Sequence, residues 1–383
     1  MPIACERVHH TSNNTMQICP NNVCYGCAVC ENICPQHAIR MIKDEAGFLY
    51  PCIDIARCIE CGKCKKVCPA NGCIISFSLP VNVFAAKASD EVLRKESQSG
   101  GIAAVISEYV INNDGVVYGA ALHDDMSVSH IRVDSDLELS RLQGSKYVQS
   151  IIREVLLQIK RDITDGKMVL FTGNPCQCAA IRNYIGMKSD KLIVIDILCH
   201  GVPSPELWMN YVHYIEKSYK GKIRAADFRD RKDPWGESNE RYEFTDNRVI
   251  KSKEYLSLFY SNVFARECCA TCQYAQQERI GDVSIGDYWG IEDVCPDFID
   301  NFGVSVVLVN TDKGKKLWDK LRDKVQAHET ILLDACRKNE PLNRPAGMSK
   351  QRKYYIKCHK LFGINGVLRY NKLIQTATRF RSH

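Results

Sequence analysis

The pattern of apolar and polar residues changes at about residue 82. Beyond this point, short continuous apolar runs alternate with stretches whose apolar residues recur at helical spacing. The runs predict buried strands, and the spaced stretches predict amphipathic helices. The expected strands cover residues 83–89, 115–122, 127–133, 167–172, 191–198, 282–287 and 304–309, and the expected helices cover 102–114, 150–162, 176–186, 205–219 and 312–326.

Strands that alternate with helices in this way are typical of an α/β domain with a mostly parallel sheet. A section richer in β-structure, with strand-like segments at 241–246 and 248–255, interrupts the alternation. Before residue 82 no such alternation is present. We therefore expect four parts: an irregular N-terminus (1–20), a small α+β domain (21–76), an α/β domain (83–335) and a C-terminal segment (341–383).

Composition and charge place the chain among globular proteins. Apolar residues make up 45% of the 383 residues and charged residues 25%. The sequence shows no signal peptide and no apolar run long enough to span a membrane. The 21 cysteines fall mostly at metal-like spacings, which favours a reducing cytoplasm.

The net charge of +6 is unevenly placed, because residues 341–383 contain ten Lys or Arg and no Asp or Glu. Three interpretations are open: a solvated basic helix or tail, a docking face for an acidic electron carrier, or contact with an anionic membrane surface. No motif supports binding to nucleic acid.

The most specific signal is a cysteine repeat in the small N-terminal domain. The pattern Cys-x2-Cys-x2-Cys-x3-Cys-Pro occurs twice, and each cysteine recurs 34 positions later. Three closely spaced thiolates suit one corner set of a [4Fe-4S] cluster, and the remote fourth reaches across to the other cluster. We assign one cluster to Cys24, Cys27, Cys30 and Cys68, and its twin to Cys58, Cys61, Cys64 and Cys34.

Zinc is the main alternative, since Cys-x2-Cys pairs also build zinc ribbons. Zinc sites need only two such pairs and give no reason for the third close cysteine. The unit resembles a bacterial two-cluster ferredoxin domain, which carries electrons one at a time.

A second group of cysteines follows three predicted strands of the α/β domain. Ligands collect beyond the carboxyl ends of parallel strands. Cys176 and Cys199 follow two such strands, and a Cys-x2-Cys pair at Cys269 and Cys272 precedes a third. We predict a third [4Fe-4S] cluster on these four residues, with Cys178 and Cys268 as neighbouring substitutes. The alternative is that Cys176 and Cys199 are buried small apolar residues.

An enzyme that exchanges electron pairs with an organic molecule and single electrons with clusters needs a converter, and a flavin provides one. Glycines before a helix allow close approach of a phosphate to unpaired N–H groups. Ser-Gly-Gly turns are also common as simple helix caps. The candidate cofactor-binding residues are Ser97, Ser99, Gly100, Gly101, Gly144, Ser145, Lys146, Tyr147, Gly173 and Asn174.

Taken together, the ordered motifs AAKASDEVLRKESQSGG, LQGSKYVQS, VLFTGNPCQ, LCHGVPSPELW, FRDRKDPWG and DVSIGDYWG, with Cys269 and Cys272, resemble a known family. They are similar to the beta subunit of coenzyme F-420 hydrogenases and dehydrogenases, in the bacterial form with a fused N-terminal ferredoxin domain. The resemblance covers roughly residues 20–310. It implies FAD at the Ser-Gly-Gly turn, a [4Fe-4S] cluster near the flavin, and hydride transfer at the flavin itself. It does not define the substrate.

Several polar and aromatic residues are candidates for the substrate face, and no catalytic nucleophile is expected. We predict an FAD-dependent iron–sulfur oxidoreductase that passes electrons between a hydride-type small molecule and a ferredoxin-like partner. The alternatives are a non-catalytic electron-transfer subunit of a larger complex and, from another class, a zinc-stapled binding protein. The candidate substrate-face residues are His200, Arg229, Asp230, Lys232, Trp235, Asp287 and Trp289. Trp235 and Trp289 are equally consistent with core aromatics.

Overall fold

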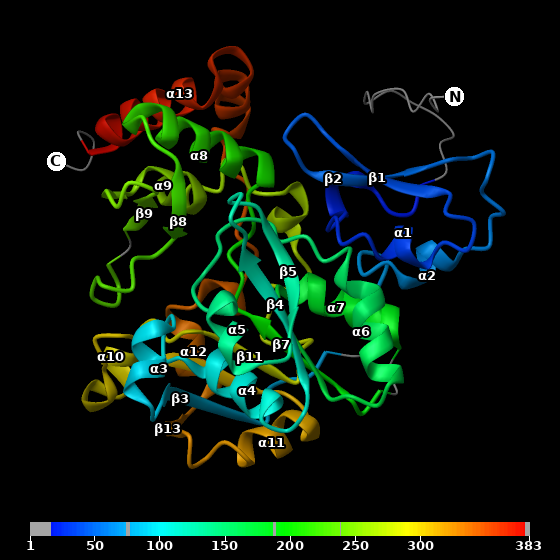
Figure 1. Ribbon diagram of the computed structural model, residues 1–383, viewed down its shortest axis with the longest axis vertical. Helices are drawn as coiled ribbons and strands as arrows, with labels where there is room; N and C mark the ends of the chain where they lie inside the picture. The colour runs from blue at the N-terminus through cyan, green and yellow to red at the C-terminus, as the bar shows by residue number, and fades with distance from the viewer. Residues whose placement is uncertain (1–16, 74–76, 187–188, 238, 380–383) are drawn as a thin grey trace.

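The computed structural model describes residues 17–73, 77–186, 189–237 and 239–379 (Figure 1). The predicted irregular N-terminus therefore lies largely outside the described residues. A small N-terminal unit lies beside a larger body built on one long sheet, and the last helix lies against the far end of that body (Figure 1). Within the described part of the chain, no helix is both long and apolar enough to cross a membrane.

The N-terminal unit contains two short helices and one hairpin. Helices α1 (Val29–Ile33) and α2 (Lys63–Val67) each follow a residue in the left-handed region, Ala28 and Gly62. Strands β1 (Ile39–Lys43) and β2 (Leu49–Ile53) pair in antiparallel register. A small apolar core around Ile39, Phe48 and Tyr50 joins the hairpin to the cysteine loops, and the two helices contact each other directly.

An eight-stranded sheet forms the centre of the larger body, in the order β13-β3-β12-β11-β7-β6-β4-β5. Among the described strands, the pairings β4–β6, β6–β7 and β7–β11 are parallel, and the other four are antiparallel. The strands are β3 (Asn82–Ala88), β4 (Val116–Leu122), β5 (Val128–Val133), β6 (Val169–Gly173), β7 (Leu192–Ile197), β11 (Val283–Asp287), β12 (Ser305–Val309) and β13 (Val325–Thr330).

The prediction of a mostly parallel sheet was therefore wrong, and the sheet is mixed. Helical crossovers enforce parallel pairing only in its middle, where α6 (Val155–Thr164) and α7 (Pro175–Ile185) connect neighbouring strands. At the edges, β4 and β5 join through a tight turn, and β12 and β13 pair antiparallel to their neighbours. The coarser prediction of an α/β body is confirmed.

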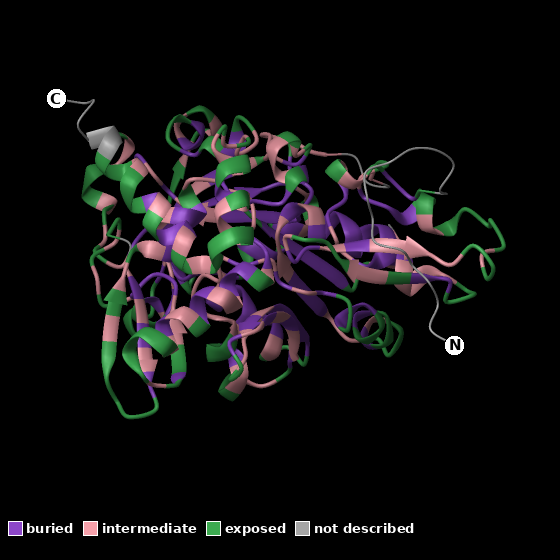
Figure 2. Cartoon of the chain, turned by 90° about the horizontal axis from the view of Figure 1, so that it is seen from above, coloured by how far each residue is buried: buried purple, intermediate pink, exposed green. Residues whose placement is uncertain are grey.

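Both faces of the sheet are covered. On one face, α4 (Ile102–Ile111) and α11 (Asp312–Asp319) bury residues such as Ile106, Leu170 and Trp318. On the other face, α6 and α7 share a core with Tyr25, Val29 and Val67 of the N-terminal unit. Buried residues accordingly gather along the sheet, and exposed ones lie at the periphery (Figure 2). The cysteine-rich unit is thus packed onto the sheet rather than tethered beside it.

A second layer surrounds a small antiparallel sheet of β8 (Ile223–Asp227), β9 (Glu240–Phe244) and β10 (Val249–Ser252). Helices α8 (Pro205–Tyr219), α9 (Glu254–Tyr260) and α13 (Arg352–Arg379) pack on it through an aromatic core that includes Trp208, Tyr242 and Tyr355. Helix α13 bends at Gly363, which lies outside helical geometry. Shorter helices complete the body: α3 (Glu91–Glu96), α5 (Asp136–Leu139), α10 (Ile291–Val294) and α12 (Leu332–Arg337).

Most predicted elements are present, with three corrections. The helix expected at 150–162 begins only at Val155, because Ile151 forms a bridge with Ser129 in extended conformation. The helix expected at 312–326 ends at Asp319 and gives way to edge strand β13. The strand expected at 248–255 ends at Ser252, and α9 follows.

Candidate functional site

The first cysteine group of the repeat lies around one cavity in the N-terminal unit. Its walls include Cys24, Cys27, Cys30 and Cys68, together with Cys19. Burial raises the pKa of Cys27 to about 12, and the backbone N–H of Val29 opposes this by facing the sulfur. The remote cysteine Cys68 thus lies with the first three, as the predicted crossover requires. Its ligation of iron stays a prediction.

The second cysteine group is nearer the surface. Burial raises the pKa of Cys64, with smaller contributions from the nearby thiols of Cys34 and Cys58. Cys34 accepts a hydrogen bond from the backbone N–H of Ala38 at 3.3 Å. Cys61, the remaining member, is exposed. The crossover partner Cys34 is therefore on the side of this second group.

The third group comes together at the ends of β6 and β7 and in the short 3-10 helix η3 (Glu267–Thr271). Burial raises the pKa of Cys176 well above its usual value, and the thiols of Cys272, Cys199 and Cys269 raise it further. The backbone N–H of Gly201 donates to Sγ of Cys199 at 3.4 Å. Four buried thiols from three separate segments therefore face one another.

The two neighbouring cysteines that were kept as substitutes lie in different surroundings. Cys178 is fully buried on α7, and its thiol donates to the carbonyls of Gly173 and Ile195, at 3.5 and 3.4 Å. These contacts turn it toward the sheet core. Cys268 is buried next to Cys269, and each thiol acts on the other. Of the two, only Cys268 remains a substitute ligand.

The first and third groups are adjacent. Cys27 is among the thiols that act on Cys176. Between the groups, Tyr25 and Tyr274 meet edge to face with ring centroids 5.5 Å apart. Within the described residues, no three side chains of His, Cys, Asp or Glu are placed to hold a single metal ion. A cubane instead spreads its four thiolates around a larger core, and its iron supplies the positive charge that buried, mutually repelling thiolates need.

The third group borders a cavity of about 600 Å³. This volume lies within the range of about 300–1,000 Å³ that is usual for cofactor and ligand sites. Cys199 and His200 are part of its wall. Nine of the ten predicted cofactor-binding residues also line it, namely Ser97, Ser99, Gly101, Gly144, Ser145, Lys146, Tyr147, Gly173 and Asn174.

Gly100 is the predicted residue that does not line the cavity. A Cβ at this position would collide with the backbone oxygen of Ala86 and lie 2.9 Å from the backbone nitrogen of Ser305. Its backbone N–H donates to Oγ of Ser305 at 3.0 Å. Gly100 is therefore required for packing against β3 and β12. Gly101, with φ +76°, begins α4 at the cavity wall.

A buried histidine in the wall was missed at the level of sequence. His130 on β5 contacts Oγ of Ser150 at 2.8 Å and the carbonyl oxygen of Thr172 at 2.8 Å. Burial lowers its pKa to about 4, so the ring is neutral at physiological pH. Gln177 donates to the carbonyl of Ser150 at 2.8 Å and accepts from the N–H of Asn174 at 3.1 Å. These bonds fix the loop between β6 and α7.

Lys146 is a cation in the same wall. Its Nζ donates to the carbonyls of Gln143 and Arg141, at 2.7 and 3.2 Å. Burial lowers its pKa to about 7, and the charge of Arg231 lowers it further while Asp227 opposes the shift. The ring of Tyr147 packs on Phe259 with centroids 4.4 Å apart. Lys146 thus provides a positive charge that an anionic group entering the cavity would stabilise.

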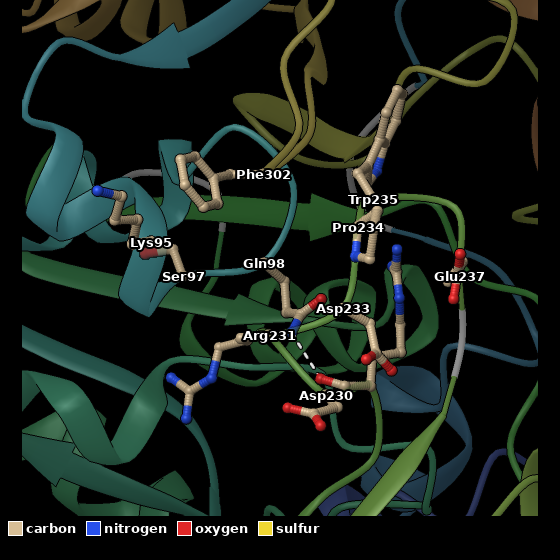
Figure 3. A pocket seen from close by; sticks show the side chains of 11 residues that line it. Lys95, Ser97, Gln98, Asp230, Arg231, Asp233, Pro234, Trp235, Glu237 and Phe302 are labelled. Atoms are coloured by element: carbon tan, nitrogen blue, oxygen red, sulfur yellow. Dashed lines mark hydrogen bonds between the residues drawn. The ribbon is translucent and has the colours of Figure 1, made fainter.

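The candidate substrate-face residues divide between the large cavity and a smaller crevice. His200, Arg229, Asp287 and Trp289 line the large cavity. Asp230 and Trp235 line a crevice of about 20 Å³ that shares Ser97, Gln98 and Arg229 with it (Figure 3). Lys232 is exposed and lines neither.

One network connects the two spaces. Asp287 accepts hydrogen bonds from Arg229 at 2.7 Å and from the indole of Trp235 at 2.9 Å. Trp235 and Trp289 stack with centroids 5.1 Å apart and planes 2° from parallel. Since both indoles are only partly buried, they form a platform at the cavity edge rather than part of the core.

This combination of cysteine groups and fold defines an iron–sulfur protein of the oxidoreductase type. Residues 23–72 match the 4Fe-4S dicluster domain, and residues 166–331 match the C terminus of the coenzyme F420 hydrogenase/dehydrogenase beta subunit. The chain belongs to the family of coenzyme F420 hydrogenase/dehydrogenase beta subunits, with a 4Fe-4S dicluster domain at its N-terminus. The predicted family is thus confirmed.

Individual relatives agree with this assignment. The chain is 22% identical to a subunit of the F(420)H(2) dehydrogenase of Methanosarcina mazei over 332 residues, which cover 82% of this chain and 86% of the relative. Over 57 residues, 15% of this chain and 73% of the relative, it is 35% identical to an uncharacterised ferredoxin of Methanocaldococcus jannaschii.

A chain from a xenon-derivatised structure of the F420-reducing [NiFe] hydrogenase complex of Methanosarcina barkeri is similar with a TM-score of 0.48 and 17% identity. The similarity covers 76% of this chain and 95% of that one.

Proposed function

We propose that this protein is an FAD-dependent iron–sulfur oxidoreductase that exchanges a hydride with a small organic molecule and single electrons with a protein partner. The observation that supports it most is the position of Cys199, which belongs to the third cysteine group and also lines the large cavity. A cofactor in that cavity would be next to the proposed third cluster. The predicted domain limits and the cytoplasmic location are parts of this proposal.

A bound flavin would exchange electron pairs with a hydride donor or acceptor and single electrons with a cluster. The chain's own residues would hold it. The N-terminus of α4 at Gly101 and the amine of Lys146 present positive charge to phosphate groups. Arg229, held by Asp287, presents a fixed charge beside the indole platform, where an organic anion would bind.

The three cysteine groups would then carry electrons outward. The third group lies beside the cavity, the first group contacts it through Cys27, and the second group ends at exposed Cys61. Neutral His130 would not add charge to the cavity wall. The chain thus offers one continuous path from a buried cavity to the surface.

Anaerobic purification with iron and flavin analysis tests this proposal. We expect about 12 irons per chain, four for each cubane, and one FAD. Cys199→Ala should lower the iron content to about eight, because one cluster loses a ligand. Cys178→Ala is the matched control: it removes another buried thiol at a strand end and should leave about 12. A preparation without flavin, or with fewer than about eight irons, contradicts the proposal.

A second function, that of a non-catalytic electron-transfer subunit of a larger complex, is favoured by the relative from Methanosarcina mazei, which is named as a subunit. The two functions differ in one measurement. If a small hydride donor reduces the flavin of the isolated chain, the chain is catalytic. If reduction needs additional subunits, the wiring function holds.

A further inference from the structure

The segment from residue 55 to residue 66 forms the surface around the second cysteine group. Residues 58, 61 and 64 of this segment are cysteines of that group, and Cys61 is exposed. By contrast, Cys24, Cys30 and Cys68 of the first group are buried. Any electron that leaves the N-terminal unit by the shortest way through the proposed clusters would therefore leave at this segment.

Apolar side chains lie beside the exposed cysteine. Ile55 is 62% exposed and Ile59 is 60% exposed, and they are the exposed large apolar residues of the described N-terminal unit, residues 17–73. Isolated exposed apolar residues need no explanation. A pair that flanks Cys58 in sequence, with Ile59 two positions before Cys61, forms an apolar centre of the kind found in protein interfaces.

Positive charge surrounds this centre. Arg57, Lys63, Lys65 and Lys66 are exposed, and Glu60 is the single exposed carboxylate between residues 55 and 66. The ion pairs of the described N-terminal unit are formed elsewhere, by Glu31 with Arg153 and by Glu45 with Lys360. The four cations are therefore available to a partner, and the segment carries a net charge of about +3 by formal counting.

We propose that this segment, with Ile55 and Ile59 at its centre and Arg57, Lys63, Lys65 and Lys66 around them, is the docking surface for an acidic one-electron carrier protein. Opposite charges guide such a carrier to the one edge of the unit where a cysteine group reaches solvent. A second copy of this chain would be repelled by the same charges. The inference rests on the proposed function only in requiring that the second cysteine group holds a cluster, and it does not depend on the flavin.

Stopped-flow electron transfer from the full chain tests the surface. The anaerobically reconstituted, dithionite-reduced chain is mixed with an oxidised, acidic plant-type [2Fe-2S] ferredoxin as the probe. We expect the second-order rate constant to fall at least tenfold between about 0.02 and 0.5 M NaCl, because salt screens exposed charges. The triple variant Lys63→Glu, Lys65→Glu, Lys66→Glu should show a fall of at least tenfold at low salt.

Two controls make the result specific. The triple variant Lys316→Glu, Lys320→Glu, Lys324→Glu makes the same change of charge on α11 and the segment after it, far from the N-terminal unit (Figure 1), and should react like the wild type. With cytochrome c, a basic acceptor, the Lys63, Lys65, Lys66 variant should react no more slowly than the wild type. A wild-type rate that does not change with salt overturns the proposal without any variant.

Iron content and the EPR spectrum of every preparation are measured first. A wild-type chain without its clusters contradicts the proposed function, whereas a loaded chain whose ferredoxin rate ignores these charges contradicts the docking surface alone. Flotation with phosphatidylglycerol vesicles covers the remaining occupant. Binding to vesicles that depends on the three lysines, with an unaffected ferredoxin rate, would replace the carrier by a lipid surface.

Discussion

Lys146 is the residue at which the cofactor proposal becomes dependent on pH. In the free chain its pKa is lowered to about 7 by burial and by Arg231, while Asp227 opposes the shift. A bound phosphate group would stabilise the charged amine and raise this pKa, so binding takes up a proton above pH 7. We expect FAD affinity to be full below pH 7 and to fall as pH rises above it, by up to about tenfold per unit.

Fluorescence titrations of FAD at pH 6, 7, 8 and 9 measure this dependence. The two histidines of the wall do not interfere, because burial holds the pKa of His130 at about 4 and lowers that of His200 below its usual 6.5. Lys146→Met should bind FAD more weakly at pH 6 and with little change up to pH 9. A wild-type affinity that is constant from pH 6 to 9 would refute the role of Lys146.

Arg266 is a buried cation between the first and third cysteine groups. In the described chain its hydrogen bonds go to the carbonyls of Cys24 and Leu49, at 2.6 and 2.8 Å, and to the side chain of Gln149 at 3.2 Å, and none goes to a carboxylate. Its guanidinium lies 4.3 Å from the ring centroid of Tyr50. An unpaired buried charge is costly, so we infer that the cysteine groups on both sides supply its counter-charge.

Removing this charge should lower the reduction potential of both neighbouring clusters, because a nearby cation stabilises the additional electron of the reduced state. For Arg266→Gln we expect a shift of roughly −60 mV, which corresponds to about tenfold in the equilibrium constant of a one-electron couple. Redox titration followed by EPR measures it. Arg266→Lys keeps the charge and should shift the potentials much less. Equal shifts in both variants would indicate that Arg266 acts through its hydrogen bonds and packing alone.

At the scale of elements, local sequence pattern predicted the strands and helices that have one strong period. The buried runs at 167–172 and 191–198 became β6 and β7, and Pro205 and Tyr219 bound α8 as predicted. Pairing direction was not predictable, because β12 has the continuous apolar pattern of a central parallel strand and yet runs antiparallel to both its neighbours. A strand that is buried on both faces looks the same in either direction.

The candidate site shows the same division. Cysteines and glycines that follow a predicted strand could be found, because the ends of parallel strands meet at one sheet edge. His130 could not be found in this way, since it lies within β5, whose place at the sheet edge beside β4 depends on long-range pairing. Gly100 was assigned to the cofactor, but only the position of β3 and β12 reveals that its missing side chain serves packing.

At the scale of the whole molecule, the cysteine groups are located where separate parts of the chain meet. The first group is shared between α1, α2 and the preceding loop, and its cavity is closed by Cys19 and Met41. The third group joins the ends of β6 and β7 to η3. The hydrophobic core under Tyr25, Val29 and Val67 is continuous with that of the large sheet. Iron at these positions would therefore connect the N-terminal unit to the sheet, in addition to carrying electrons.

Removal of iron should consequently unfold part of the molecule and leave the rest. The described N-terminal unit has two helices of five residues and one hairpin, with a small core, so the free energy of cluster binding contributes much of its stability. The sheet core around Ile106, Leu170 and Val307 contains no cysteine of these groups. After iron is chelated under anaerobic, reducing conditions, hydrogen exchange read by mass spectrometry should show lost protection at 24–68 and 267–272 and retained protection in β6, β7 and β12. Protection that survives at 24–68 in the iron-free chain would show that the apolar contacts alone hold this unit on the sheet.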